Sequence, residues 1–184
     1  MFTFVSDYSL FMTEKQENIL KAALKLFATQ GYASTSTSKV AKEAGVSEGL
    51  IFRHFESKEG LLAAILEMGH GLMKQKMAEI LMTSDPKEML RKYIELPFKI
   101  DQSEYEMWRL MYALKWQTNG YDTTIIEPMK LLLKNAFEKL GYENPDAEVE
   151  LLLMFMDGAA TSFLLHEPSN KQDILNSLKI KYQL

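Results

Sequence analysis

The chain has 184 residues, of which 47% are hydrophobic and 25% charged, a composition typical of a folded protein rather than a disordered or fibrous one. It contains no cysteine, which excludes a disulfide framework and a thiolate metal site and fits a reducing cytoplasm. The formal net charge of -4 excludes a uniformly basic nucleic-acid coat, so any contact with DNA must come from a local patch.

Residues 1–11 lack the basic start and continuous apolar stretch of a signal peptide, and we expect them to form a mobile extension. The next part of the chain is slightly basic. Residues 12–60 hold seven Lys and Arg against six Asp and Glu, whereas residues 61–184 hold fourteen against eighteen. This asymmetry has the sign expected if the front of the chain faces phosphates.

Residues 13–30 are predicted to form an amphipathic helix, because apolar side chains recur every three or four positions. Gly31 follows where a left-handed residue commonly ends a helix, and Tyr32 is placed to pack back on Phe27. The sequence therefore predicts a defined stop for this first helix.

Two short helices are predicted next, at residues 39–44 and 48–55, on either side of a glycine-containing turn. Ser36 or Thr37 is expected to cap the first, and Ser47 the second. This pattern predicts a helix-turn-helix, in which the second helix enters the major groove of DNA. A plain corner of a three-helix bundle is the alternative.

The second short helix carries side chains suited to reading DNA. Gly49 permits close approach to the duplex, Leu50 can meet a thymine methyl, and Arg53 can bind a guanine edge or a phosphate. Hydroxyls and basic groups around the two helix starts can hold the DNA backbone. The predicted DNA-binding residues are Ser36, Thr37, Ser38, Lys39, Ser47, Glu48, Gly49, Leu50, Phe52, Arg53, His54 and Lys58.

Beyond residue 57 the periodicity predicts long helices with short breaks and no strand. Gly69 to Gly71 lies inside the first of them and is expected to break it locally, as a hinge or a weak point. The predicted helices are 58–82, 86–99, 103–117, 123–140, 146–166 and a weaker one at 171–179.

The front of the chain resembles the N-terminal region of TetR-type repressors over residues 19–62. The shared features are the Gly-Tyr helix stop, Val-Ala-x-x-Ala-Gly-Val-Ser at 40–47 and Phe-x-His-Phe-x-Ser-Lys-Glu at 52–59. The resemblance implies an all-helical homodimer. A helix-turn-helix head over residues 12–59 would precede a larger ligand-binding and dimerisation domain over residues 60–184.

The resemblance also bears on single positions. His54 and Lys58 match the family's contacts to the DNA backbone, whereas Phe52 stands where a phosphate-binding Tyr is common and lacks its hydroxyl. Glu48 is repelled by phosphates, so it either accepts a hydrogen bond from a cytosine amine or points away. Leu50 and Arg53 are the residues most expected to read bases.

Large polarizable side chains gather in the middle of the chain and predict a pocket for an apolar or aromatic effector. Packing in a core is the alternative for each of them. The pocket residues are Tyr93, Phe98, Trp108, Met111, Tyr112 and Trp116.

Residues 149–165 are apolar nearly all round, and Asp157 lies in their middle, which favours a buried helix over a membrane span. With residues 123–140 this helix fits an intersubunit four-helix bundle of the kind that the resemblance implies, or the core of a monomer. The predicted dimer-interface residues are Leu133, Phe137, Leu152, Phe155, Met156, Ala159 and Phe163.

Together these features predict a cytoplasmic, sequence-specific transcriptional regulator, most simply a repressor released from a palindromic operator by a small molecule. Two alternatives remain: a helical adaptor that binds a protein through Leu50 and Phe52, and an enzyme with a helical pocket. We expect no enzyme activity, cofactor or metal, since the three histidines are far apart and no nucleotide-binding or catalytic motif is present.

Overall fold

The computed structural model describes residues 12–115, 126–166 and 168–184, and within these ranges the chain forms helices and no strand. The all-α prediction is therefore confirmed. The chain divides into two compact units. Unit 1 takes its described residues from Met1–Lys74 and Gln102–Gln117, and unit 2 from Gln75–Asp101 and Thr118–Leu184. The extension predicted at residues 1–11 lies outside the described residues.

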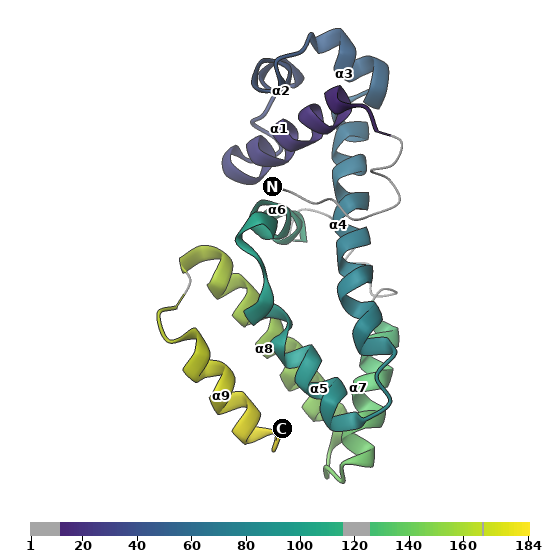
Figure 1. Ribbon diagram of the computed structural model, residues 1–184, viewed down its shortest axis with the longest axis vertical. Coiled ribbons are helices and arrows are strands. Elements are labelled where there is room, and N and C mark those ends of the chain that lie inside the picture. Colours follow the sequence, from purple (N-terminus) through teal and green to yellow (C-terminus); the bar gives the residue numbers. More distant parts are fainter. Residues whose placement is uncertain (1–11, 116–125, 167) are drawn as a thin grey trace. The chain divides into compact units, whose positions relative to one another are not determined.

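Figure 1 labels the helices in chain order. Unit 1 contains α1 (Glu14–Gln30), α2 (Thr37–Ala44), α3 (Glu48–Phe55), the first part of α4 (Lys58–Leu81), the 3-10 helix η3 (Gln102–Glu104) and α6 (Tyr105–Lys115). Unit 2 contains the last turns of α4, α5 (Pro86–Glu95), the 3-10 helix η2 (Leu96–Lys99), α7 (Glu127–Lys139), α8 (Pro145–His166) and α9 (Lys171–Lys181). The head, meaning α1 to α3, thus shares its unit with α6, and the predicted domain boundary at residue 60 stays a prediction.

The first helix begins and ends as its sequence predicts. The Thr13 hydroxyl accepts a hydrogen bond from the Gln16 amide, and the Gln16 side chain accepts one from the Thr13 amide, which completes a capping box. Gly31 ends the helix at φ 86°, and Tyr32 packs its ring edge-on against Phe27 with centroids 5.1 Å apart. The predicted stop is confirmed.

The two short helices lie where the sequence places them, although α2 begins two residues earlier than predicted. Ser36 caps α2 by accepting from the Lys39 amide, and Gly45 ends it in the left-handed conformation. Ile51 of α3 is fully buried in the core of unit 1. Two capped helices around a left-handed glycine hold the exposed face of α3 in a defined orientation.

The local break expected from Gly69 to Gly71 is wrong, because α4 runs without interruption through these residues. Gly69 serves packing instead. A Cβ atom there would lie 2.7 Å from the Met111 sulfur and 3.0 Å from the Met107 sulfur of α6. The missing side chain therefore leaves room for the two methionine side chains of α6.

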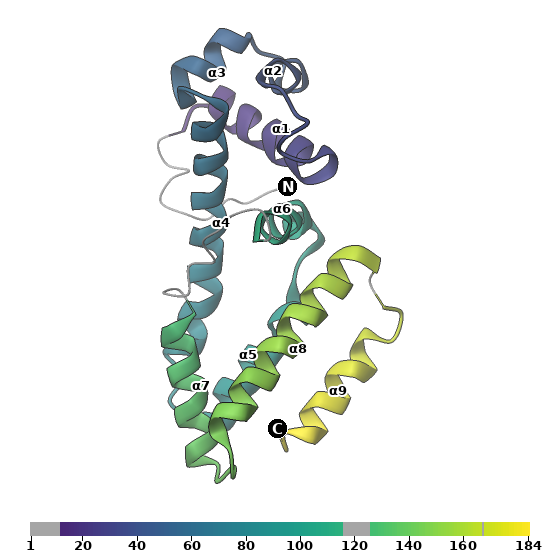
Figure 2. The same ribbon diagram turned by 180° about the vertical axis from the view of Figure 1, so that it is seen from behind.

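Unit 2 is built around α8, which packs against α7 and η2, while α9 runs alongside it (Figure 2). Five of the seven predicted dimer-interface residues are buried in the single chain: Leu133, Phe137 and Leu152 in the core of unit 2, and Ala159 and Phe163 further along α8. The other two, Phe155 and Met156, are half-buried against that core. The reason is the apolar character of α8 on nearly every side, which leaves the sequence unable to separate the core face from an outward one.

The C-terminus of unit 2 is anchored by Tyr182, whose ring lies among Phe137 and Tyr142. Burial raises the pKa of Tyr182 to about 12, and the carboxylate of Glu148 adds to the shift. In the unfolded chain a tyrosine has a pKa of about 10, so as the pH rises Tyr182 loses its proton in the unfolded state first. The stability due to Tyr182 is therefore complete below about pH 10 and is lost between about pH 10 and 12.

We therefore expect the urea midpoint of the wild-type chain to fall over that pH range, and Tyr182→Phe to fall less steeply. Unfolding curves of both proteins at several pH values check this. Parallel pH profiles would show that Tyr182 does not carry the dependence.

Candidate nucleic-acid interface

The start of α2 presents polar groups at the surface of the head. Ser36 and Ser38 are exposed, Thr37 is half-buried, and the Lys39 ammonium donates to the Gln30 side chain at 3.3 Å. The amides at this helix start and the hydroxyls around them form a site suited to a phosphate, since a helix N-terminus carries partial positive charge.

The outward face of α3 carries the residues predicted to reach base edges. Gly49 is exposed, and a Cβ atom there would meet nothing within 4 Å. Arg53 is also exposed, and in the described part of the chain its guanidinium has no hydrogen-bond or ion-pair partner. Phe52 is 47% exposed, whereas Leu50 is half-buried and packs against the core of unit 1, so less of Leu50 is accessible than expected.

A side-chain hydrogen bond joins the starts of the two short helices. The Thr37 hydroxyl donates to the Glu48 carboxylate at 2.6 Å. Thr37 is the first residue of α2 and Glu48 the first of α3, so the bond spans the turn between them. Ser47, although it precedes α3, makes no side-chain cap hydrogen bond. Glu48 therefore points toward α2 in the free protein, an arrangement that the sequence did not predict.

The beginning of α4 holds the last predicted phosphate contact. The Lys58 ammonium lies 4.2 Å from the centre of the Tyr32 ring and donates to the Ala33 carbonyl at 3.4 Å, while the Tyr32 hydroxyl donates to Glu59 at 3.2 Å. Tyr32 thus positions Lys58, a role that sequence reasoning missed because 26 residues separate the two. His54 is half-buried beside the ring of Phe55.

The predicted effector-pocket residues do not gather in one unit. Tyr93 and Phe98 belong to unit 2, where the ring of Phe98 packs edge-on against that of the buried Phe163, with ring centroids 5.0 Å apart. Trp108, Met111 and Tyr112 belong to unit 1. Trp108 is buried and donates to the Glu104 carboxylate at 3.1 Å, and Trp116 lies outside the described residues. The pocket built from these six residues stays a prediction.

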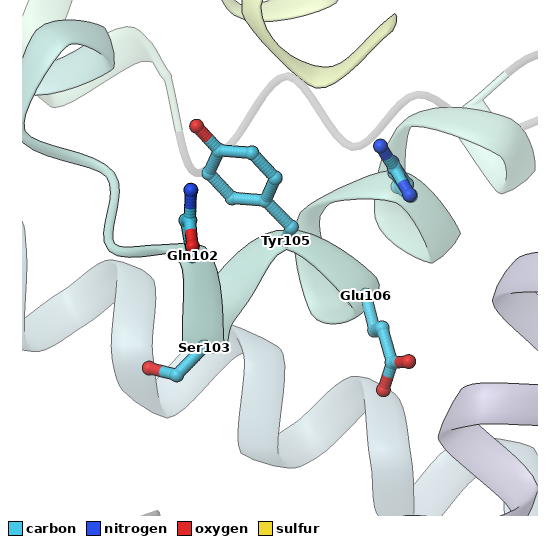
Figure 3. A pocket seen from close by; sticks show the side chains of 5 residues that line it. Gln102, Ser103, Tyr105 and Glu106 are labelled. Atoms are coloured by element: carbon cyan, nitrogen blue, oxygen red, sulfur yellow. The ribbon is translucent and has the colours of Figure 1, made fainter.

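Two open hollows lie elsewhere. One, of about 390 Å³ in unit 1, is lined at the start of α6 by Gln102, Ser103, Tyr105, Glu106 and Arg109. Figure 3 shows the side chains of Gln102 and Tyr105 on one side of this helix start and those of Ser103 and Glu106 on the other. The second hollow, of about 340 Å³ in unit 2, is a groove lined by Phe155 of α8 and by Asn170, Asp173, Ile174, Ser177, Leu178 and Lys181 in or next to α9. Neither contains a predicted effector-pocket residue.

An exposed apolar stripe runs along α8, here called the α8 stripe: Leu151, Met154, Gly158, Thr161 and Leu165. The spacings alternate between three and four residues, and Met154 and Leu165 are 69% and 70% exposed.

Within the described ranges, α8 is the one helix long and apolar enough to cross a membrane. This is weak evidence for a membrane span, because core helices of other proteins have the same length and composition. No group of three or more His, Asp or Glu in those ranges is placed to hold a metal ion.

Comparison with known proteins shows that this head is similar to those of a family of regulators. Residues 19–65 match the family model of "Bacterial regulatory proteins, tetR family". The chain is 41% identical over 91 residues to YerO, an uncharacterized HTH-type transcriptional regulator of Bacillus subtilis (strain 168), a match that spans 48% of this chain and 32% of YerO. The chain thus covers about a third of that relative's length.

Two other matches extend over most of the chain. The HTH-type transcriptional repressor AcnR of Corynebacterium glutamicum is 24% identical over 159 residues, which span 83% of this chain and 81% of AcnR. The crystal structure of AibR in complex with isovaleryl coenzyme A and operator DNA superposes with a TM-score of 0.69 at 18% identity, over 90% of this chain and 96% of that one. The fold is therefore that of a helix-turn-helix head followed by a helical C-terminal domain.

Proposed function

Since residues 19–65 form a helix-turn-helix head of the tetR family of bacterial regulatory proteins, we propose that the chain is a sequence-specific repressor that binds a palindromic operator as a homodimer. A small molecule releases it from the operator. The protein acts in the bacterial cytoplasm, where its DNA lies. That its relatives are transcriptional regulators, a class without enzymatic activity, supports a regulatory role over catalysis.

The observation that carries this proposal is the free guanidinium of Arg53 beside Gly49 on the exposed face of α3. A helix in the major groove reads bases through such groups, and an arginine bound through both nitrogens to a guanine edge is the commonest specific contact. The start of α2 and Lys58 supply backbone contacts that set the register of α3 on the duplex.

The α8 stripe supports the dimer. Its spacing averages 3.5 residues, the period at which one helix keeps a seam facing a partner helix. Gly158 lies at the middle of the stripe, and a Cβ atom there would meet nothing within 4 Å, so packing inside the monomer does not require this glycine. A second copy seated on the stripe and on the groove beside α9 would cover side chains that water otherwise contacts.

A two-fold dimer places two copies of α3 in successive major grooves, so the operator has half-sites ~34 Å apart. A dimer whose two heads are spaced differently fits this operator poorly, so a ligand that binds this second form more tightly lowers operator affinity. The size of the effect is limited by the difference between the ligand's affinities for the two forms of the dimer. AibR was crystallised with both isovaleryl coenzyme A and operator DNA, which supports a ligand-responsive reading of the shared fold.

The test is selection of duplexes from a randomised pool, followed by binding titrations against selected and random DNA at several salt concentrations. We expect a palindromic selected site and a clear preference for it. Arg53→Ala is expected to weaken binding to that site about 10- to 100-fold, and to change binding to random DNA far less.

The matched control is Arg91→Ala, which removes the same side chain from α5, where it pairs with Glu88. This variant should bind like the wild type. Equal affinity of the wild-type chain for selected and random duplexes would reject sequence-specific regulation. If the chain bound no DNA at any of these salt concentrations, the result would favour a protein-binding adaptor that uses the exposed Phe52.

A further inference from the structure

The bond between Thr37 and Glu48 places a carboxylate where DNA binding calls for a phosphate. Thr37 stands at the start of α2, and its hydroxyl donates to Glu48 at 2.6 Å. A threonine hydroxyl has a single hydrogen to donate, so it serves either the carboxylate or a phosphate oxygen. In the free head this donor is occupied.

The surroundings make the competition direct. Glu48 faces the start of α2, where the Ser36 hydroxyl caps the helix and Ser38 is exposed at the surface. Partial positive charge at a helix start attracts any anion, whether it comes from the protein or from DNA. Glu48 thus acts as an internal substitute for the phosphate, and its charge repels the DNA backbone.

We propose that Glu48 is a specificity-determining residue that keeps the head off unspecific DNA by holding the Thr37 hydroxyl. On the correct site the carboxylate leaves Thr37 and accepts a hydrogen bond from the amino group of a cytosine, which frees the hydroxyl for a phosphate. At most positions of a random duplex no cytosine amino group faces the carboxylate, so Glu48 stays on Thr37 more often and the phosphate contact is made less often. This inference rests on the proposed function and assigns one base contact within it.

The experiment compares Glu48→Ala with the wild type on a random duplex and on the duplex selected by the wild-type chain. Glu48→Ala is expected to bind random DNA about threefold tighter, with a salt dependence steeper by about one charge. On the selected duplex its affinity should stay level or fall. Equal tightening on both duplexes, or no tightening on random DNA, would overturn the proposal.

Thr37→Val tests whether the carboxylate acts through the hydroxyl. In the Thr37→Val background, Glu48→Ala should give less gain on random DNA, because no donor remains to be freed. An undiminished gain would reduce Glu48 to a repulsive charge and overturn the proposal. The matched control is Glu43→Ala. This change also removes a carboxylate from the head, but one that forms an ion pair with Lys25 at 2.6 Å and not a bond with Thr37. It should leave the preference for selected DNA unchanged.

A measurement without DNA separates this inference from the proposed function. In a double-mutant cycle on the full chain, Thr37→Val and Glu48→Ala should be non-additive, with a coupling of about twofold to fivefold in the unfolding equilibrium constant. Additive effects would show that the pair does not form and would overturn the proposal. Loss of sequence preference in the wild type, with the coupling intact, would instead reject the proposed function.

Discussion

The Gly60→Ala substitution is expected to destabilise the head by about 3 kcal/mol, the largest steric effect expected of a Gly→Ala change among the glycines that the structure describes. A Cβ atom at Gly60 would lie 2.0 Å from the carbonyl oxygen of Phe55 and 3.2 Å from its carbonyl carbon. Both are backbone atoms, so no side chain can rotate away to make room. The clash has to be relieved by moving the junction between α3 and α4.

That junction is tightly constrained. Glu56 ends α3 with φ at 65°, a conformation rare for residues with a side chain, and the Gly60 amide donates to the Ser57 hydroxyl at 3.0 Å. The junction orients α3 relative to Lys58, which follows directly. We therefore expect Gly60→Ala to lose DNA affinity as well as stability.

Thermal and urea unfolding followed by circular dichroism measures the effect. Gly71→Ala is the matched control, because it lies in the same helix and a Cβ atom there would meet nothing within 4 Å. This control should gain about 0.5 to 1 kcal/mol, since alanine is the better helix former. A Gly60→Ala protein as stable as the wild type would show that the junction tolerates a side chain.

The Met154→Glu substitution is expected to have the largest effect on DNA binding. It places a charge within the α8 stripe, where Met154 is 69% exposed in the single chain. If a second copy covers this stripe, the charge loses its water and the dimer separates. A monomer engages one half-site at a time, so affinity for the palindrome should fall about 100-fold or more.

Analytical ultracentrifugation gives the oligomeric state, and titration of the selected palindrome gives the affinity. The matched control is Met82→Glu, the same change at a methionine that is 87% exposed, follows the end of α4 and is not part of the stripe. It should remain a dimer with wild-type affinity. A dimeric Met154→Glu protein would place the interface elsewhere.

The α8 stripe also bears on the dimer-interface residues predicted from the sequence, which stay a prediction. Leu152, Ala159 and Phe163 of α8 are predicted interface residues that are buried in the single chain. The residues left for a partner are a mixture of large and small ones, including Gly158 and Thr161. Hydropathy does not separate the two sets, because it measures how apolar a residue is and not which neighbour covers it.

The effector pocket is predicted from the same kind of pattern. Trp108 and Tyr112 recur at helical spacing, and Tyr93 and Phe98 come shortly before them. The structure distributes them over two units, with Trp108 and Tyr93 buried. Proximity along the chain indicates a shared helix face only within one helix, and a break such as η2 ends that relation.

What the sequence by itself determined is the local order of the head: the capped start of α2, the left-handed Gly45, the stop at Gly31 and the inward Ile51. These features depend on residues within about four positions of one another, which is the reach of a helix hydrogen bond or a cap. A propensity and a periodicity therefore suffice to predict them.

Only the tertiary structure decided which partner each exposed group has. It placed Glu48 on Thr37, Lys58 on the ring of Tyr32, and the uncovered face of α8 along Met154 and its neighbours. Each of these pairs residues 11 or more positions apart, or depends on which helices cover α8. Such contacts follow from how whole helices pack, and no local pattern records that packing.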